Sequence, residues 1–280
     1  MLNVYTGILK MTNEFRDDGL EVPLKYLIGA DYSDLLKAYN LREIASKSAK
    51  TDFAKAINLL EWISSKIYHY VNYNNRIENS ASKLFEYSLG KGVENGLNCR
   101  SLSFALTECL LAVGIKARTV YIMPFSPYDD DNHVVCEAWS DSLNKWFMLD
   151  PTYNLYAIYE GVYLSIFELR NKLANREIIE FNENANYNGK PLNKDEITSY
   201  YAKNLFRFMV SDIQGSDSEN IEGRKMIDIT PVGYDVTRSA LANIDFRVKE
   251  KGECESTHKW RKNVLDNTVI YKGIDILYRK

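Results

Sequence analysis

One segment of the chain, residues 96–151, constrains the fold more than any other. It opens with a run whose apolar side chains recur at three- and four-residue steps, which indicates an amphipathic helix. Three strand-like runs follow, and a short polar turn separates the last two. We expect the helix over 101–113 and the strands over 116–123, 133–139 and 145–149. A helix followed closely by antiparallel strands predicts an α+β fold, with the helix packed against the sheet.

The predicted helix starts at a cysteine. Asn98 is a favourable N-cap residue, which places Cys99 at the first helical position. The unpaired N–H groups and the dipole of a helix favour a thiolate there, and the same N–H groups can donate to a developing oxyanion. The preceding loop contains Gly90, Gly92 and Gly96, which allow backbone and substrate to approach closely.

A histidine and an aspartate lie at matching ends of the predicted hairpin. Strand alternation places His133 and Asp150 on the same face of the sheet. If Trp139 and Asn144 close a four-residue loop, His133 lies directly opposite Asp150. Such residues have Cβ atoms roughly 4.5–5.5 Å apart, within reach of an imidazole–carboxylate hydrogen bond. Pro151 then ends the strand, because it has no N–H to donate to a neighbouring strand.

These three side chains are the parts of an activated cysteine nucleophile. Cys99 supplies the thiol, His133 a base that deprotonates it, and Asp150 a carboxylate that orients the base. Acyl-transfer chemistry is therefore the leading hypothesis for this chain.

The remaining cysteines and histidines favour structural interpretations. Cys109 lies on the buried stripe of the predicted helix, and Cys136 alternates away from the histidine face, so we expect both in the core. Cys254 and His258 have a CxxxH spacing but no second ligand pair nearby, which favours a surface loop over a zinc site. His69 follows a helical pattern and is expected to be a structural residue.

Outside this segment the sequence predicts further helices and, near its end, a change from helical to strand-like patterns. Helical periodicity predicts helices over 52–70, 165–174 and 194–210. The stretch GSDSEN at 215–220 is the best internal linker candidate. Beyond it, MIDITPVGYDV, NIDFRVK and NTVIYKGIDILY favour β-structure.

Composition excludes several classes of function. The chain has 280 residues, of which 45% are hydrophobic and 26% charged, and its net charge is −3. It therefore lacks the excess of positive charge that binding to nucleic acid or to an anionic membrane requires. No run approaches the roughly 18 apolar residues of a membrane span. The N-terminus lacks a basic start, an apolar stretch and a small-residue cleavage site, which argues against export and favours a cytoplasmic location.

The segments GLNCRSLSFALTECLLAVGIKARTVYI, HVVCEAW and KWFMLDPT, with the helix before them, resemble the transglutaminase-like superfamily over about residues 50–156. That superfamily is a branch of the papain-like fold that includes transglutaminases, peptide N-glycanases and bacterial peptidases. The resemblance implies that Cys99 is the nucleophile, His133 the base and Asp150 the orienting carboxylate. It implies no metal or organic cofactor.

The sequence departs from the family pattern in the histidine strand and before the cysteine. Leu97 replaces a frequent glycine, while Val134 and Val135 replace Ala-Trp, although Glu137 keeps the family's glutamate. An aromatic wall of the substrate site is therefore missing or supplied from elsewhere.

The family completes its oxyanion hole with a side chain upstream of the cysteine. Asn72, Asn74 and Asn75 lie in a suitable loop, and the sequence does not choose between them.

We therefore expect a cysteine hydrolase, a peptidase or amidase, that cleaves peptide or carboxamide bonds through a thioester. A transglutaminase with an amine acceptor, a non-catalytic binding module with the same fold, and a scaffold that binds a partner through its C-terminus are the alternatives. The expected organisation is an N-terminal extension at 1–49, a catalytic core at 50–160, a helical extension at 161–214 and a β-rich segment at 215–280.

Overall fold

The computed structural model describes residues 1–29, 31–73, 75–215 and 221–278. Its helices are α1 (Leu2–Met11), α2 (Ser33–Ala38), α3 (Leu41–Ser46), α4 (Asp52–Lys66), α5 (Ala81–Ser88), α6 (Cys99–Ala112), α7 (Ile166–Ala174), α8 (Lys194–Asn204), α9 (Val236–Lys251) and α10 (Glu255–Asp266), with the 3-10 helices η1 (Val93–Asn95) and η2 (Ile274–Leu277). Over these ranges, no helix combines the length and the apolar character needed to cross a membrane.

A six-stranded sheet forms the centre of the molecule. Its strands, in spatial order, are β13 (Ile270–Tyr271), β12 (Met226–Ile229), β10 (Arg207–Ser211), β2 (Ala117–Met123), β3 (His133–Ser140) and β4 (Lys145–Leu149). The pairs from β12 to β4 are antiparallel, and β13 joins β12 in parallel. The smaller pairings involve β1 (Lys25–Tyr26), β5 (Ala157–Tyr159), β6 (Val162–Tyr163), β7 (Glu180–Phe181), β8 (Asn186–Tyr187), β9 (Lys190–Pro191) and β11 (Ile213–Gln214).

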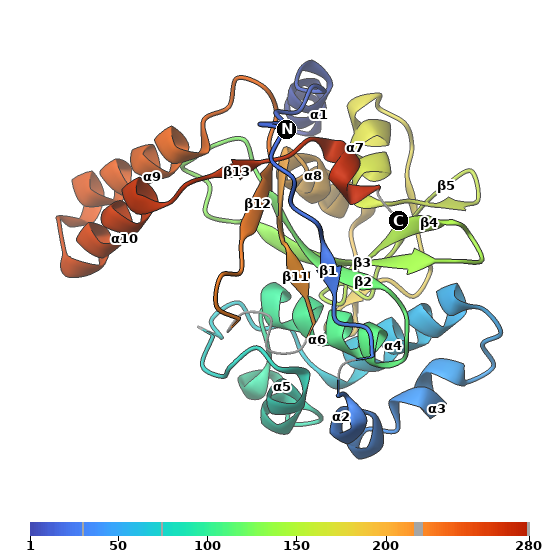
Figure 1. The fold of residues 1–280 in the computed structure, drawn as a ribbon. Helices are drawn as coiled ribbons and strands as arrows, with labels where there is room; N and C mark the ends of the chain where they lie inside the picture. Colours follow the sequence, from blue (N-terminus) through green and yellow to red (C-terminus); the bar gives the residue numbers. More distant parts are fainter. Residues whose placement is uncertain (30, 74, 216–220, 279–280) are drawn as a thin grey trace.

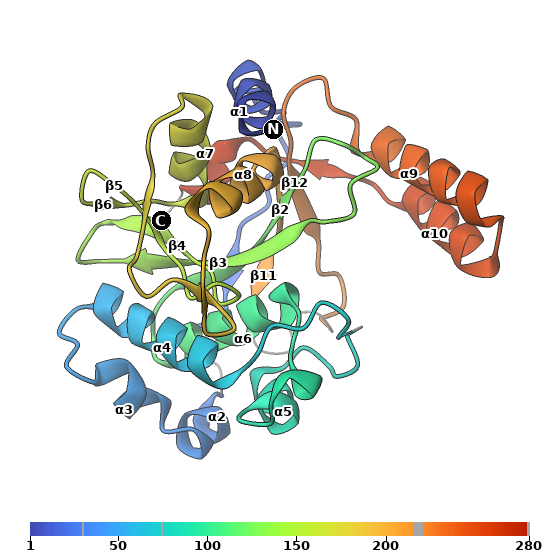
Figure 2. The same ribbon diagram turned by 180° about the vertical axis from the view of Figure 1, so that it is seen from behind.

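Helices cover both faces of this sheet, as Figures 1 and 2 show. One face packs against α6, with α2 to α5 around it, and the strands contribute residues such as Cys136 and Phe147 to that core. The other face packs against α1, α7 and α8, with Val135 and Met148 from the strands. Two apolar cores on opposite sides of one mostly antiparallel sheet confirm the predicted α+β class.

The predicted hairpin is present, but its register differs from the expected one by two residues. Ser140 pairs with Lys145, and Glu137 with Met148, whereas we expected Trp139 and Asn144 to close the loop. Asn144 has a φ of 51° and occupies the left-handed region inside the turn, which asparagine tolerates well. Because the shift is an even number of residues, every side chain keeps its predicted face.

Two predicted helices end earlier than their periodicity suggested. The helix at 52–70 stops at Lys66, and the chain continues in extended form to pair with Leu97. The helix at 194–210 stops at Asn204, and residues 207–211 form β10, a central strand of the sheet. In both cases tertiary pairing of an apolar run overrides the local helical pattern.

The prediction of a β-rich C-terminal segment is largely wrong. The stretch NIDFRVK lies within α9, which Asp235 caps by accepting a hydrogen bond from the backbone N–H of Arg238. Helices α9 and α10 form a hairpin that projects from one side of the molecule (Figures 1 and 2). Within residues 221–278, which the structure describes, the strands are β12 and β13, and they extend the main sheet. Apart from Gly215, the proposed linker at 215–220 falls outside the described residues.

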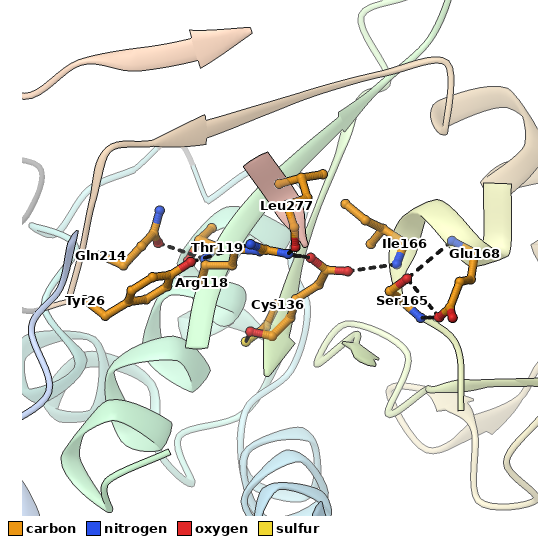
Figure 3. Close-up of polar contacts among 10 residues, drawn as sticks. Tyr26, Arg118, Thr119, Cys136, Ser165, Ile166, Glu168, Gln214 and Leu277 are labelled. Atoms are coloured by element: carbon orange, nitrogen blue, oxygen red, sulfur yellow. Dashed lines mark hydrogen bonds and ion pairs between the residues drawn. The ribbon is translucent and has the colours of Figure 1, made fainter. Parts of the chain in front are cut away.

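A buried ion pair links β2 and β3 to distant parts of the chain (Figure 3). Arg118 lies opposite Glu137, and their closest nitrogen and oxygen atoms are 2.6 Å apart. Arg118 also donates to the carbonyl oxygen of Leu277, and the second carboxylate oxygen of Glu137 accepts from the N–H of Ile166 at 2.8 Å. This ion pair therefore ties the sheet to the C-terminal segment and to the start of α7.

Candidate active site

The cysteine occupies the predicted place at the start of a helix. Helix α6 begins at Cys99, and the Asn98 side chain accepts a hydrogen bond from the N–H of Ser101 at 3.0 Å, as an N-cap does. The N–H of Cys99, at the first helical position, has no acceptor within the helix, so it can donate to a substrate oxygen. Cys99 itself is partly exposed, whereas almost all of the rest of α6 is buried.

A close backbone approach places a second histidine beside this cysteine. The segment before α6 pairs with the segment after α4, where Leu97 bridges to His69. A Cβ atom at Gly96 would lie 2.7 Å from the carbonyl oxygen of Tyr68, so only glycine fits there. The predicted close approach at Gly96 is therefore confirmed, and it fixes the distance between the two strand-like segments.

His133 and Asp150 are directly hydrogen-bonded. Nε2 of His133 lies 2.6 Å from Oδ2 of Asp150, and both side chains are almost fully buried. The observed register makes them diagonal neighbours, and a histidine and a carboxylate are long enough to meet across that diagonal. Since Nε2 is engaged, Nδ1 is the ring nitrogen that remains for Cys99.

Two further groups hold the carboxylate. The Tyr201 hydroxyl of α8 donates to Oδ2 of Asp150 at 2.6 Å, and the backbone N–H of Thr152 donates to Oδ1 at 2.9 Å. Both oxygens of this buried carboxylate are thus hydrogen-bonded, as a buried charge requires.

The electrostatics of the three residues favour a thiolate–imidazolium pair. Burial by itself raises the pKa of Cys99, but hydrogen bonds and charge from His133 and His69 outweigh it and lower the pKa to about 6. Burial disfavours the His133 imidazolium, yet the charge and hydrogen bond of Asp150, together with Cys99, raise its pKa to about 10. Burial also opposes ionisation of Asp150, but His133 and then Tyr201 keep its pKa below the usual value.

His69 is held in place by the β8–β9 hairpin. Its backbone N–H donates to Oδ1 of Asn188 at 2.8 Å, and Nδ2 of Asn188 donates to the His69 carbonyl oxygen at 3.0 Å. The Tyr187 hydroxyl lies 3.0 Å from Nδ1 of His69. His69 is a hydrogen-bonded structural residue, as expected, but it also lines the cleft with Cys99 and contributes to the lowered pKa of that thiol.

A cleft of about 830 Å³ opens over these residues. Its polar and apolar lining comes from five parts of the chain: His69, Val71, Asn98, Cys99, Asp130, Asp131, Asn132, His133, Thr152, Tyr153, Tyr187, Lys190, Pro191, Leu192, Asn193, Glu196, Ile197 and Tyr200. The rings of Tyr153 and Tyr200 lie 5.6 and 5.4 Å from that of His133. Val135, which stands where the family has a tryptophan, is fully buried in the core. The aromatic residues that line the site therefore come from other parts of the chain.

The other predicted residues lie away from this cleft. Cys109 and Cys136 are fully buried, as expected. Cys254 lies in the exposed loop between α9 and α10, as expected, where it is the N-cap residue of α10. Among the described residues no three His, Cys, Asp or Glu side chains could hold a metal. Of the upstream asparagines, Asn72 and Asn75 do not line the cleft, and Asn74 lies outside the described residues.

Comparison with known families agrees with this geometry. Residues 40–151 match the sequence model of the transglutaminase-like superfamily. The chain therefore contains a transglutaminase-like domain, whose fold is suited to cysteine-based acyl transfer. No curated protein and no solved structure gave a significant match. The matched range holds Cys99, His133 and Asp150 but ends before Tyr187 and Tyr201.

Proposed function

We propose that this protein is a cysteine hydrolase that cleaves peptide or carboxamide bonds through a thioester intermediate. The observation that carries the proposal is the arrangement at one cleft: Cys99 at a helix N-terminus shares the cleft with His133, and His133 binds a buried Asp150 at 2.6 Å. A nucleophile, a base and an orienting carboxylate in this order are the parts that acyl transfer needs.

The first step forms the thioester. The Cys99 thiolate attacks the substrate carbonyl carbon, and the N–H groups at the start of α6 stabilise the negative oxygen. The carbon–nitrogen bond then breaks as the His133 imidazolium gives its proton to the departing amine. To His69, which lines the same cleft as Cys99, we assign a further hydrogen bond to this oxyanion. It takes the part that the sequence had left to the upstream asparagines.

The second step releases the acyl group. His133, now neutral, takes a proton from water as the water oxygen attacks the thioester carbon. The carbon–sulfur bond breaks, and the products are a carboxylic acid and the regenerated thiolate–imidazolium pair.

Water is the acceptor that the cleft favours. Cys99 is partly exposed, and Asp131, Lys190 and Glu196 of the cleft lining are exposed, which supports water as the acceptor. A transferase would need to shield the thioester from water until an amine arrives.

The test uses unfolded casein as the probe substrate, with and without a dansyl-labelled primary amine. We expect wild-type protein, but not Cys99→Ala, to produce new termini or deamidated side chains by mass spectrometry. Amine incorporation in preference to hydrolysis would instead identify a transferase. Absence of any Cys99-dependent product, together with an unreactive thiol, would identify a non-catalytic module.

A further inference from the structure

Tyr201 contacts the proposed site from outside the transglutaminase-like range. It is fully buried, and its hydroxyl donates to Oδ2 of Asp150 at 2.6 Å. The same oxygen binds Nε2 of His133, also at 2.6 Å. Tyrosine and histidine therefore share one oxygen of the carboxylate.

We propose that Tyr201 is a positioning residue that acts through Asp150, and that its hydroxyl makes it easier for His133 to release a proton to the departing amine. The inference rests on the proposed function, because it concerns a proton that only acyl transfer uses.

The physical argument compares the two states of the imidazole. When His133 is protonated, the carboxylate of Asp150 has a cationic partner. When His133 is neutral, the buried carboxylate keeps its charge with neutral donors alone: the Nε2–H of His133, the Tyr201 hydroxyl and the Thr152 N–H. A hydrogen bond to a charge is worth most where no other charge compensates it. The hydroxyl therefore stabilises the neutral state of His133 more than the protonated one.

The phenol can serve only as a donor in this role. Burial and the neighbouring Asp150 raise the pKa of Tyr201 well above its usual value, so the hydroxyl keeps its proton. Helix α8 holds the ring on the sheet face where it packs with Phe181. The hydroxyl is thus fixed on the carboxylate throughout the reaction.

Other groups also face His133, and a test must hold them constant. They are Cys99 from α6, Asp150 after β4, Tyr153 in the loop that follows, and Tyr200 and Tyr201 from α8. Asp131 and His69 line the same cleft. Removing only the Tyr201 hydroxyl leaves all the others in place.

The experiment is an NMR titration of His133 in full-length protein. The chain has three histidines, so His69→Gln and His258→Gln variants assign the signals. A Cys99→Ala background removes the thiolate, which is one of the groups that raise the pKa of His133 to about 10. The midpoint of the His133 titration is therefore lower in this background. This readout does not depend on turnover, so it stands apart from success or failure of the casein assay.

In Tyr201→Phe we expect the midpoint of His133 to rise by about half a pH unit or more, because the neutral state loses one of its donors. Tyr200→Phe is the matched control: its hydroxyl lies 3.3 Å from Asp131, not on Asp150, so the midpoint should stay. Because Tyr200 lines the cleft, its replacement can also affect catalysis. The two variants are therefore compared only by the midpoint of the His133 titration.

A second variant keeps the test decisive if Tyr201→Phe folds poorly. Replacing Tyr201 by 3-fluorotyrosine makes the hydroxyl a stronger donor and should lower the midpoint. A midpoint that is unchanged or falls in Tyr201→Phe, or that does not fall with 3-fluorotyrosine, would overturn the proposal. A purely structural loss would weaken the His133–Asp150 contact and move the midpoint downward.

Discussion

Cys99 lies between two histidines with different surroundings. His133 is buried and bound to Asp150, whereas His69 is held by Tyr187 and Asn188 at the cleft wall. Both lower the pKa of the thiol, with His133 the larger contributor. The sequence indicated the first histidine by its strand position. It gave no sign of the second, because the pairing of His69 with Leu97 depends on tertiary structure.

Replacing His69 tests its contribution. In His69→Ala we expect the pH midpoint of Cys99 alkylation to rise by about one unit, because one donor to the thiolate is lost while His133 remains. The rate of alkylation by iodoacetamide, followed by peptide mass spectrometry, measures it. His258→Ala is the control, since that exposed residue interacts with Glu253 away from the cleft. An unchanged midpoint in His69→Ala would remove His69 from the account.

Helix α6 presents the sulfur, and its N-cap determines where the helix begins. Asn98 accepts from the N–H of Ser101, and Thr51 caps α4 in the same way through Ala54. Both caps could be predicted, because capping depends on residues that are close in sequence. The ends of α4 and α8 could not, because sheet pairing beyond each helix decides where it stops.

Removing each cap separates stability from reactivity. Asn98→Ala and Thr51→Ala should each lower the free energy of unfolding by about 1 kcal/mol, measured by urea denaturation. Only Asn98→Ala should also slow alkylation of Cys99, because it loosens the helical turn that carries the sulfur. Equal alkylation rates in the two variants would show that the cap does not position the thiol.

The whole molecule is organised around one sheet with two cores, and the Arg118–Glu137 pair connects its parts. The sequence predicted the sheet class and the three candidate side chains, because each depends on local pattern and strand parity. It did not predict the hairpin register, which a single left-handed residue in the turn determines. Nor did it predict α9, where the short run NIDFRVK has strand-like composition but continues a capped helix.

The buried pair should contribute to global stability more than to chemistry. Glu137→Gln leaves Arg118 buried without its charge partner, and we expect a loss of about 3–5 kcal/mol in the free energy of unfolding. The midpoint of Cys99 alkylation should stay where it is, since the pair does not line the cleft. Urea denaturation and alkylation on the same samples check both statements. A shifted midpoint with little loss of stability would contradict this assignment.

The central claim is that His133 activates Cys99, and the rate of Cys99 alkylation against pH tests it most directly. For the wild type we expect reactivity to rise through about pH 6, because the thiolate forms above that pKa. In His133→Ala the rise should move toward the free-thiol value of about 8.5. If the alkylation rate of the wild type rises only near that free-thiol value, and does so identically in His133→Ala, His133 does not activate Cys99. The proposed acyl-transfer chemistry would then be contradicted.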